Sequence, residues 1–398
     1  MRARNRFFRH GLVLVAVAAV LGIASGAARA EPSFTVVALP DTQFYSSTYP
    51  DTFTAQTNWI VNNKAAWNIV FVTHEGDLIN TYTSSTEWSN AAGAMDNLNG
   101  VVPYGTAPGN HDTNGGNSYT DFLNNFGPAS ARFSGKTWYG GAGGPNSGSS
   151  YMFFQAGSRQ FMALELDSNQ ANTSTLNWAQ GILDAHKDMP TIVTMHDYLG
   201  FGGISSTGQY FWDNLVKLHG NSQVFMVLNG HTSSTRYQVD TDVDGKPVYE
   251  MLADYQYLYL TSNGFGYMRL ITFDPDSSAI HIKTYSPLNG EGFMTDSANQ
   301  FDITGVDFGR LPEPATLSML ALGALAIVRR ARKAPSSSWC RPEKSGRQGQ
   351  LLAPASHTTV RTVPYTAVHA EPLRRRCSWT RLTRPWWLNQ RPGTAWFM

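Results

Sequence analysis

Short polar clusters follow apolar runs at five places along this 398-residue chain. The apolar runs have the length and composition of buried strands; they cover residues 34–39, 69–72, 101–107, 192–195 and 224–228. In an α/β fold, residues just past the carboxyl ends of strands gather at one edge of the sheet, where ligands bind. The spacing therefore predicts that side chains far apart in the sequence meet at one site.

These clusters are rich in acidic, amide and imidazole side chains. They are Pro40-Asp41-Thr42-Gln43, Gly76-Asp77-Leu78-Ile79-Asn80, Gly109-Asn110-His111-Asp112, Met195-His196-Asp197 and Gly230-His231-Thr232. Asp, Asn and His brought together are the ligands that hard or borderline divalent metals require. The pattern indicates a hydrolase with a pair of metal ions.

The series resembles the motifs of the calcineurin-like metallophosphoesterases. Asp41, Asp77, Asn110, His196 and His231 follow the family's order, at separations of 36, 33, 86 and 35 residues. The resemblance extends from residue 34 to about residue 285. It implies an α/β fold in which two mixed β-sheets pack as a sandwich flanked by helices.

The resemblance also implies two divalent metal ions of the Mn, Fe, Zn or Mg class. Asp77 would bridge the two ions. The other implied ligands are Asp41 and Gln43 for the first metal, and Asn110, His196 and His231 for the second.

Two further residues are implied to act on a phosphate-ester substrate. His111 would lie near the leaving-group oxygen as a general acid or transition-state stabiliser, and Asp112 would orient its ring. Two cations about 3.5–4 Å apart can activate a water and bind the phosphoryl oxygens, so no Ser or Cys nucleophile is needed.

The chain departs from the family pattern at two positions of the first metal. Gln43 and Ser233 stand where the family usually has His. An oxygen-rich site favours Mn, Mg or Ca over zinc. A surface-sorted binding protein that keeps the fold but has impaired catalysis is therefore the alternative to a phosphoesterase. Asp254 follows an apolar pair, but nothing in the sequence fixes whether it points toward the site.

Residues 1–30 have the features of a secretory signal peptide. A basic start precedes the apolar stretch 12–24 and the small-x-small site Ala28-Arg29-Ala30. An uncleaved membrane anchor is the alternative, although the stretch is shorter than the about 20 residues that a spanning helix needs.

The region after the folded body resembles a bacterial PEP-CTERM sorting signal. Pro312-Glu313-Pro314 precedes an apolar run and a basic cluster within residues 311–333. This implies an exported protein of the periplasm, cell surface or extracellular matrix, a membrane anchor, and an exosortase-like sorting protease as a partner. We expect residues 334–398 to be disordered or a mis-extended reading frame; a basic surface-binding tail is the alternative.

The charge of residues 31–310 argues against a nucleic-acid partner. This body, expected to be one metallophosphoesterase domain, has 26 Asp and Glu but only 11 Lys and Arg. Nonspecific binding to nucleic acid rests on Lys and Arg. A phosphate-bearing substrate must therefore be attracted locally, by bound cations.

The pattern between the motifs predicts helices, a loop and hairpins. Helices are expected over residues 53–67, 87–98, 175–185 and 210–218. The Gly-rich residues 135–150 indicate a long flexible loop, with a lid as the alternative. Residues 240–245 open like a calcium loop but lack its final Glu, which favours a hairpin turn between 236–239 and 248–252.

Overall fold

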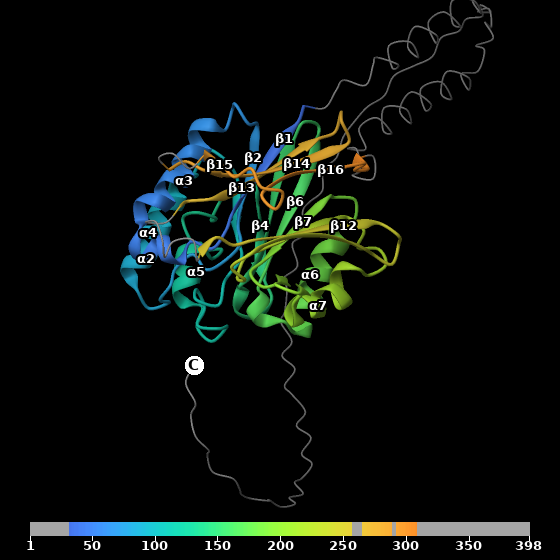
Figure 1. The fold of residues 1–398 in the computed structure, drawn as a ribbon. Coiled ribbons are helices and arrows are strands. Elements are labelled where there is room, and N and C mark those ends of the chain that lie inside the picture. Colours follow the sequence, from blue (N-terminus) through green and yellow to red (C-terminus); the bar gives the residue numbers. More distant parts are fainter. Residues whose placement is uncertain (1–31, 257–264, 289–291, 309–398) are drawn as a thin grey trace, which may run out of the picture. The chain divides into compact units, whose positions relative to one another are not determined.

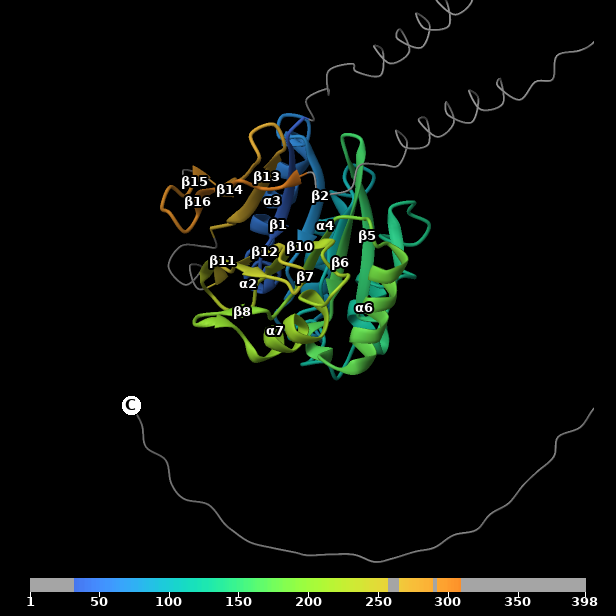
Figure 2. The ribbon, with the colours of Figure 1, turned by 90° about the vertical axis from the view of Figure 1, so that its right-hand side faces the viewer.

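The computed structural model describes residues 32–256, 265–288 and 292–308. Two large β-sheets pack face to face there, with helices on their outer sides (Figures 1 and 2). The predicted α/β sandwich is confirmed. The predicted signal peptide, sorting segment and tail lie outside the described residues.

The first sheet has parallel strands at one side and antiparallel strands at the other. Its order is β15-β14-β13-β1-β2-β3, with β16 also paired to β14. Strands β1, β2 and β3 are parallel, whereas β13 runs antiparallel to β1. The strands are β1 (Phe34–Leu39), β2 (Ile69–His74), β3 (Tyr104–Thr106), β13 (Met268–Asp274), β14 (Ala279–Ser286), β15 (Gly292–Phe293) and β16 (Gln300–Thr304).

The second sheet has the order β11-β12-β10-β7-β6-β5-β4. Its central strands β6, β7, β10 and β12 are parallel, and β5 and β11 are antiparallel to their inner neighbours. Its strands are β4 (Tyr139–Gly143), β5 (Ser149–Ala156), β6 (Arg159–Leu166), β7 (Thr191–Met195), β10 (Val224–Asn229), β11 (Thr235–Thr241) and β12 (Pro247–Ala253). A separate hairpin joins β8 (Leu199–Gly200) to β9 (Gly203–Ile204).

Helices cover both outer faces of the sandwich (Figures 1 and 2). They are α2 (Gln43–Thr48), α3 (Pro50–Asn63), α4 (Ser85–Asp96), α5 (Thr120–Phe126), α6 (Thr173–Ala185) and α7 (Ser206–Phe211), with a 3₁₀ turn at Ser168–Gln170. The predicted helix 53–67 ends earlier, at Asn63, and the predicted helix 210–218 divides into the end of α7 and a π turn, Trp212–Val216. Among the described residues, none of these helices could span a membrane.

Strand β6 illustrates why the apolar runs of the sequence lack alternating polar residues. Phe161 and Ala163 pack into the core between the sheets, while Met162 and Leu164 pack into the core under α6 and α7. Successive side chains on a strand point to opposite faces. Because both faces are buried, the strand has no polar alternation.

The Gly-rich segment differs from the predicted flexible loop. Residues 139–143 form the edge strand β4, which a 3₁₀ turn (Pro145–Ser147) connects to β5. A Cβ at Gly140 would lie 2.1 Å from the Tyr151 ring, and one at Gly143 would lie 1.9 Å from Trp178 Nε1. These glycines make room for aromatic side chains that cover the strand.

The predicted turn after β11 is confirmed as a hairpin. Thr241 pairs with Pro247 across the turn. The Asp242 carboxylate accepts hydrogen bonds from the backbone N–H groups of Asp244 and Lys246, at 2.9 and 2.7 Å. The acidic residues here thus stabilise a turn.

Glu165 is a buried acid between the two sheets. Its carboxyl group accepts a hydrogen bond from Thr73 Oγ1 of the opposite sheet, at 3.0 Å. Burial raises the pKa of Glu165 to about 8, although the Thr73 bond opposes the shift. The folded protein therefore holds a proton here that the unfolded chain releases near pH 4.5.

This proton predicts a pH-dependent stability. Between about pH 4.5 and pH 8 the folded state binds more protons, so the free energy of unfolding falls as pH rises. Glu165→Gln does not titrate. We expect its stability relative to wild type to improve by about 2–4 kcal/mol from pH 5 to pH 8, measured by denaturant unfolding. A free energy of unfolding that changes equally with pH in wild type and Glu165→Gln would contradict the prediction.

Candidate metal centre

The loop after β2 brings Asp77 against the second sheet. Gly76 and Asp77 both have left-handed backbones, with φ of 94° and 50°. For Asp77 this conformation is costly, and such strain persists where the surroundings enforce it, often at functional sites. A Cβ at Gly76 would lie 2.7 Å from His196 Nδ1, and one at Gly109 would lie 2.0 Å from Asp77 Oδ1. The two glycines permit the close approach.

Four of the predicted ligands meet around one nitrogen atom, His196 Nε2. Asp77 Oδ2 lies 3.1 Å from this atom, Asn110 Oδ1 lies 3.0 Å from it, and His231 Nδ1 lies 3.1 Å from it. The ligand atoms of Asp77, His196 and His231 all lie within 4.8 Å of one another, a possible metal site. The structure thus brings residues 77, 110, 196 and 231 together, and their role as metal ligands stays a prediction.

The His196 ring is oriented from behind by the backbone. Its Nδ1 donates to the Glu75 carbonyl oxygen at 2.9 Å, which leaves Nε2 facing the cluster. A carbonyl behind the ring is the usual partner of a metal-binding histidine. Burial alone would lower the pKa of His196, but the Asp77 carboxylate outweighs it and raises the pKa to about 9. In turn, burial would raise the pKa of Asp77, but His196 lowers it below its usual range.

His231 completes the cluster from the second sheet. It follows β10 with a left-handed φ of 68°, and its ring lies 4.8 Å from that of His196. Burial lowers the pKa of His231, and the neighbouring His196 lowers it further. A neutral imidazole is the form that binds a metal.

Asp41 and Gln43 lie at the end of β1, beside Asp77. The Asp41 carboxylate is fully buried. Burial raises its pKa well above the usual range, and the carboxylates of Asp77, Asp254 and Asp112 raise it further. The Gln43 side chain is also buried; its Nε2 donates to Gln256, while its Oε1 accepts no hydrogen bond from any residue that the structure describes.

His111 lies at the cluster, but Asp112 does not orient its ring. The His111 backbone N–H donates to Asp77 Oδ1 at 2.8 Å, and its ring Nδ1 donates to the Asn80 carbonyl at 2.6 Å. Asp112 instead accepts hydrogen bonds from the backbone N–H groups of Ile79 and Gly109. The expected role of Asp112 is therefore corrected: its buried carboxylate ties two site loops together. Burial raises its pKa to about 7, with a further contribution from Asp77.

Two residues after β12 also belong to this site. Asp254 is one of the carboxylates that raise the pKa of Asp41, and Gln256 bonds to Gln43. Burial raises the pKa of Asp254 to about 6, although hydrogen bonds from Gln256 oppose the shift. The signal available in the sequence was that Asp254, like His231, comes just after a buried strand.

The donor groups fit divalent cations. Several carboxylates are buried together, and the Gln43 amide oxygen has no hydrogen-bond donor among the described residues. Burying like charges together is costly unless a counter-charge is held between them. Carboxylate, amide and imidazole groups are ligands for such ions.

Comparison with known proteins agrees with this geometry. The calcineurin-like phosphoesterase family model matches residues 34–234. The chain belongs to the calcineurin-like phosphoesterases. The matched region ends in the loop between β10 and β11. It therefore includes every strand end that is followed by a predicted metal ligand. A PEP-CTERM protein-sorting motif matches residues 311–333, as predicted.

One curated relative is similar to this chain. The chain is 36% identical over 267 residues to the uncharacterized protein YvnB of Bacillus subtilis (strain 168). The match covers 65% of this chain but only 20% of YvnB. The chain thus spans about one fifth of the length of this relative.

Two solved phosphatases are similar at lower levels. Purple acid phosphatase PPD1 from yellow lupin is 16% identical, with a TM-score of 0.47, over 71% of this chain and 55% of PPD1. A dimetal phosphatase from Danio rerio is 12% identical, with a TM-score of 0.43, over 68% of this chain and 98% of that protein. The family assignment rests on the sequence match.

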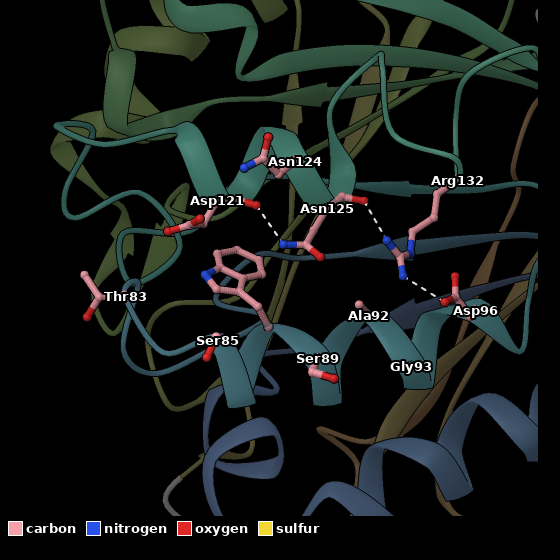
Figure 3. A pocket seen from close by; sticks show the side chains of 11 residues that line it. Thr83, Ser85, Ser89, Ala92, Gly93, Asp96, Asp121, Asn124, Asn125 and Arg132 are labelled. Atoms are coloured by element: carbon pink, nitrogen blue, oxygen red, sulfur yellow. Dashed lines mark hydrogen bonds and ion pairs between the residues drawn. The ribbon is translucent and has the colours of Figure 1, made fainter.

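A groove between α4 and α5 lies apart from this site (Figure 3). It has a volume of about 540 Å³ and a mostly polar lining. Arg132 lies at one end, where it donates to the Asp96 carboxylate and the Asn125 carbonyl, at 2.8 and 3.0 Å. None of the predicted site residues lines the groove, so it takes no part in the metal cluster.

Gly76 and Gly100 offer a matched test of the cluster. Both have positive φ, but a Cβ at Gly76 meets His196, whereas one at Gly100 meets nothing within 4 Å. Each Ala variant should lose about 1 kcal/mol of stability from the left-handed backbone. We expect only Gly76→Ala to weaken Mn²⁺ binding, by at least about tenfold, because it displaces the His196 ring.

Isothermal titration with Mn²⁺ and thermal unfolding would be measured on both variants. Equal Mn²⁺ affinity in the two variants would show that the close approach of Gly76 to His196 does not support ion binding.

Proposed function

We propose that the protein is an exported, metal-dependent phosphoesterase that hydrolyses a phosphate mono- or diester, with water as the nucleophile. The observation that carries this proposal is the convergence of Asp77, Asn110, His196 and His231, from loops of both sheets, within a family that has this activity. Asp77 and Asn110 follow strands of the first sheet, and His196 and His231 follow strands of the second.

The residues divide into two ligand groups around Asp77. Asn110, His196 and His231 would hold one ion, and Asp41 and Gln43 the other, with Asp77 between them. When bound, the two ions would supply the positive charge that activates water and binds phosphoryl oxygens. The protein contributes orientation: Glu75 fixes His196 through its carbonyl, and Gly109 leaves room for the Asp77 carboxylate.

His111 is proposed as the general acid. The Nδ1–H of the His111 ring donates to the Asn80 carbonyl oxygen. Nε2 is therefore the ring nitrogen that can donate a proton to the leaving group. Its backbone bond to Asp77 ties the acid to the proposed bridging ligand. A general acid must be held within hydrogen-bonding distance of the leaving-group oxygen.

The sorting motif supports export and surface sorting. On this proposal, an exosortase-like protease processes the protein, and the segment 311–333 anchors it to the membrane before processing. The acidic body, with 26 Asp and Glu against 11 Lys and Arg in residues 31–310, supports the absence of a nucleic-acid scaffold among its partners.

A binding protein without catalysis is the second candidate. It is favoured by one observation, the replacement of two first-metal imidazoles by Gln43 and Ser233. The metal content of the full chain discriminates: two ions per chain together with turnover support the enzyme, whereas no bound ion supports the binding protein.

If His111 is the general acid, its removal should slow substrates with poor leaving groups more than those with good ones. His111→Ala should lower kcat about 10²–10⁴-fold for phenyl phosphate in the presence of Mn²⁺, because the poor leaving group needs a proton. The loss should be smaller for p-nitrophenyl phosphate, whose anion leaves unaided. The number of bound Mn²⁺ ions should not change.

Two variants serve as controls for this measurement. Asp77→Asn should remove turnover of both substrates and reduce bound Mn²⁺. His281→Ala, which affects a ring paired with Asp302 at 2.7 Å, should keep wild-type rates. An equal loss for both substrates in His111→Ala would argue against proton donation.

A further inference from the structure

The site has a carboxylate next to the position where an imidazole is missing. Ser233 stands where the family pattern has its second His, in the loop between β10 and β11. Gln43, another predicted first-metal ligand, has a buried amide oxygen that accepts no hydrogen bond from the described residues. The chain needs another donor here if it holds two ions.

The sheet topology brings Asp254 to the same edge as His231. Strands β10 and β12 are parallel neighbours, and Asn229 pairs with Leu252. Asp254 and His231 therefore each lie two residues past this pair. Residues past the ends of parallel strands share one edge of the sheet.

Hydrogen bonds fix Asp254 beside the Ser233 position. Its backbone N–H donates to the Ser234 carbonyl at 2.9 Å, and its side chain is buried, with 2% exposed. Gln256 holds both carboxylate oxygens: the backbone N–H donates to Oδ1 at 2.8 Å and the side-chain Nε2 donates to Oδ2 at 2.7 Å. Each oxygen keeps a further lone pair for a cation.

Gln256 also connects this carboxylate to both halves of the site. Its Nε2 lies 3.4 Å from the His231 carbonyl oxygen, and its Oε1 accepts a hydrogen bond from the Gln43 side chain. Gln256 thus holds the Gln43 Nε2, and the Gln43 Oε1 is left to face the proposed ion. The side-chain amides of Gln43 and Gln256 therefore orient the Asp254 carboxylate and the Gln43 Oε1. Hydrogen bonds of this kind commonly position metal ligands.

Asp254 also adds charge where an ion would need it. Its carboxylate acts electrostatically on Asp41 and Asp77, and all three side chains are buried. Buried carboxylates that repel one another are costly unless a cation offsets their charge. A role confined to stabilising the turn after β12 would not account for this repulsion between Asp254 and Asp41.

We propose that Asp254, positioned by Gln256, is a ligand of the first metal and replaces the imidazole lost at Ser233. This inference rests on the proposed two-metal phosphoesterase. The first site then has only oxygen donors, from Asp41, Gln43, Asp77 and Asp254, and prefers Mn²⁺ or Mg²⁺ to Zn²⁺. The second site keeps its two imidazoles.

The test counts Mn²⁺ ions bound to the full chain by equilibrium dialysis and calorimetry. Wild type should bind two ions, one more weakly. Asp254→Asn, which keeps the size and an acceptor for Gln256, should lose the weaker ion or bind it at least about tenfold less tightly, with the tighter ion unchanged. Glu250→Gln is the matched control, because this buried acid on β12 bonds to Tyr198 and Gln238 instead, and it should bind both ions as wild type does.

Each outcome is decisive. An Asp254→Asn protein that keeps both affinities overturns the inference and leaves the phosphoesterase proposal standing. A wild-type chain that binds fewer than two ions overturns both. If Asp254→Asn does not fold, Gln256→Ala replaces it: removal of the positioning amide should weaken only the weaker ion, and an unchanged affinity overturns the inference.

Discussion

The site depends on one contact across the sandwich, between Asp77 and His196. Asp77 follows β2 of the first sheet and His196 follows β7 of the second, and their side-chain atoms lie 3.1 Å apart. The approach requires that no Cβ stands between the loops, a condition that Gly76 and Gly109 satisfy. A metal bridge between the sheets is possible only because the backbones come this close. The other candidate ligands then take their places around this pair.

The same closeness has an electrostatic cost. Asp41, Asp77 and Asp254 are buried near one another, and burial disfavours the charged form of each. The left-handed backbones of Asp77 and His231 add strain. An arrangement that only stabilised the fold would avoid both costs. Two bound divalent ions would offset the charge, which is the physical reason to assign these groups to ligand roles.

The sequence predicted which side chains meet at the site better than it predicted the groups that support them. Residues such as Asp77 and His196 are recognisable because a polar cluster directly follows an apolar run. The groups that orient the site side chains include backbone carbonyls, such as that of Asn80, which bonds to the His111 ring. Every residue has a backbone carbonyl, so the sequence does not show which one will orient a ring. The predicted loop at 135–150 contains the strand β4, whose glycines make room for the rings of Tyr151 and Trp178, a packing reason that composition does not reveal. Asp254 needed the pairing of β12 with β10, which only the fold supplies.

The two proposed sites differ in a way that bears on where the protein works. A site with imidazole donors can hold its ion tightly, whereas one built from carboxylate and amide oxygens prefers hard cations, which are generally bound more weakly. Occupancy of a weak site follows the free cation concentration by mass action. An exported protein has the cation supply of its surroundings rather than of the cytosol. On the proposed assignment, replacement of His by Gln43 and Ser233 makes the catalytic state depend on external Mn²⁺ or Mg²⁺, with the second ion as the permanent part of the centre.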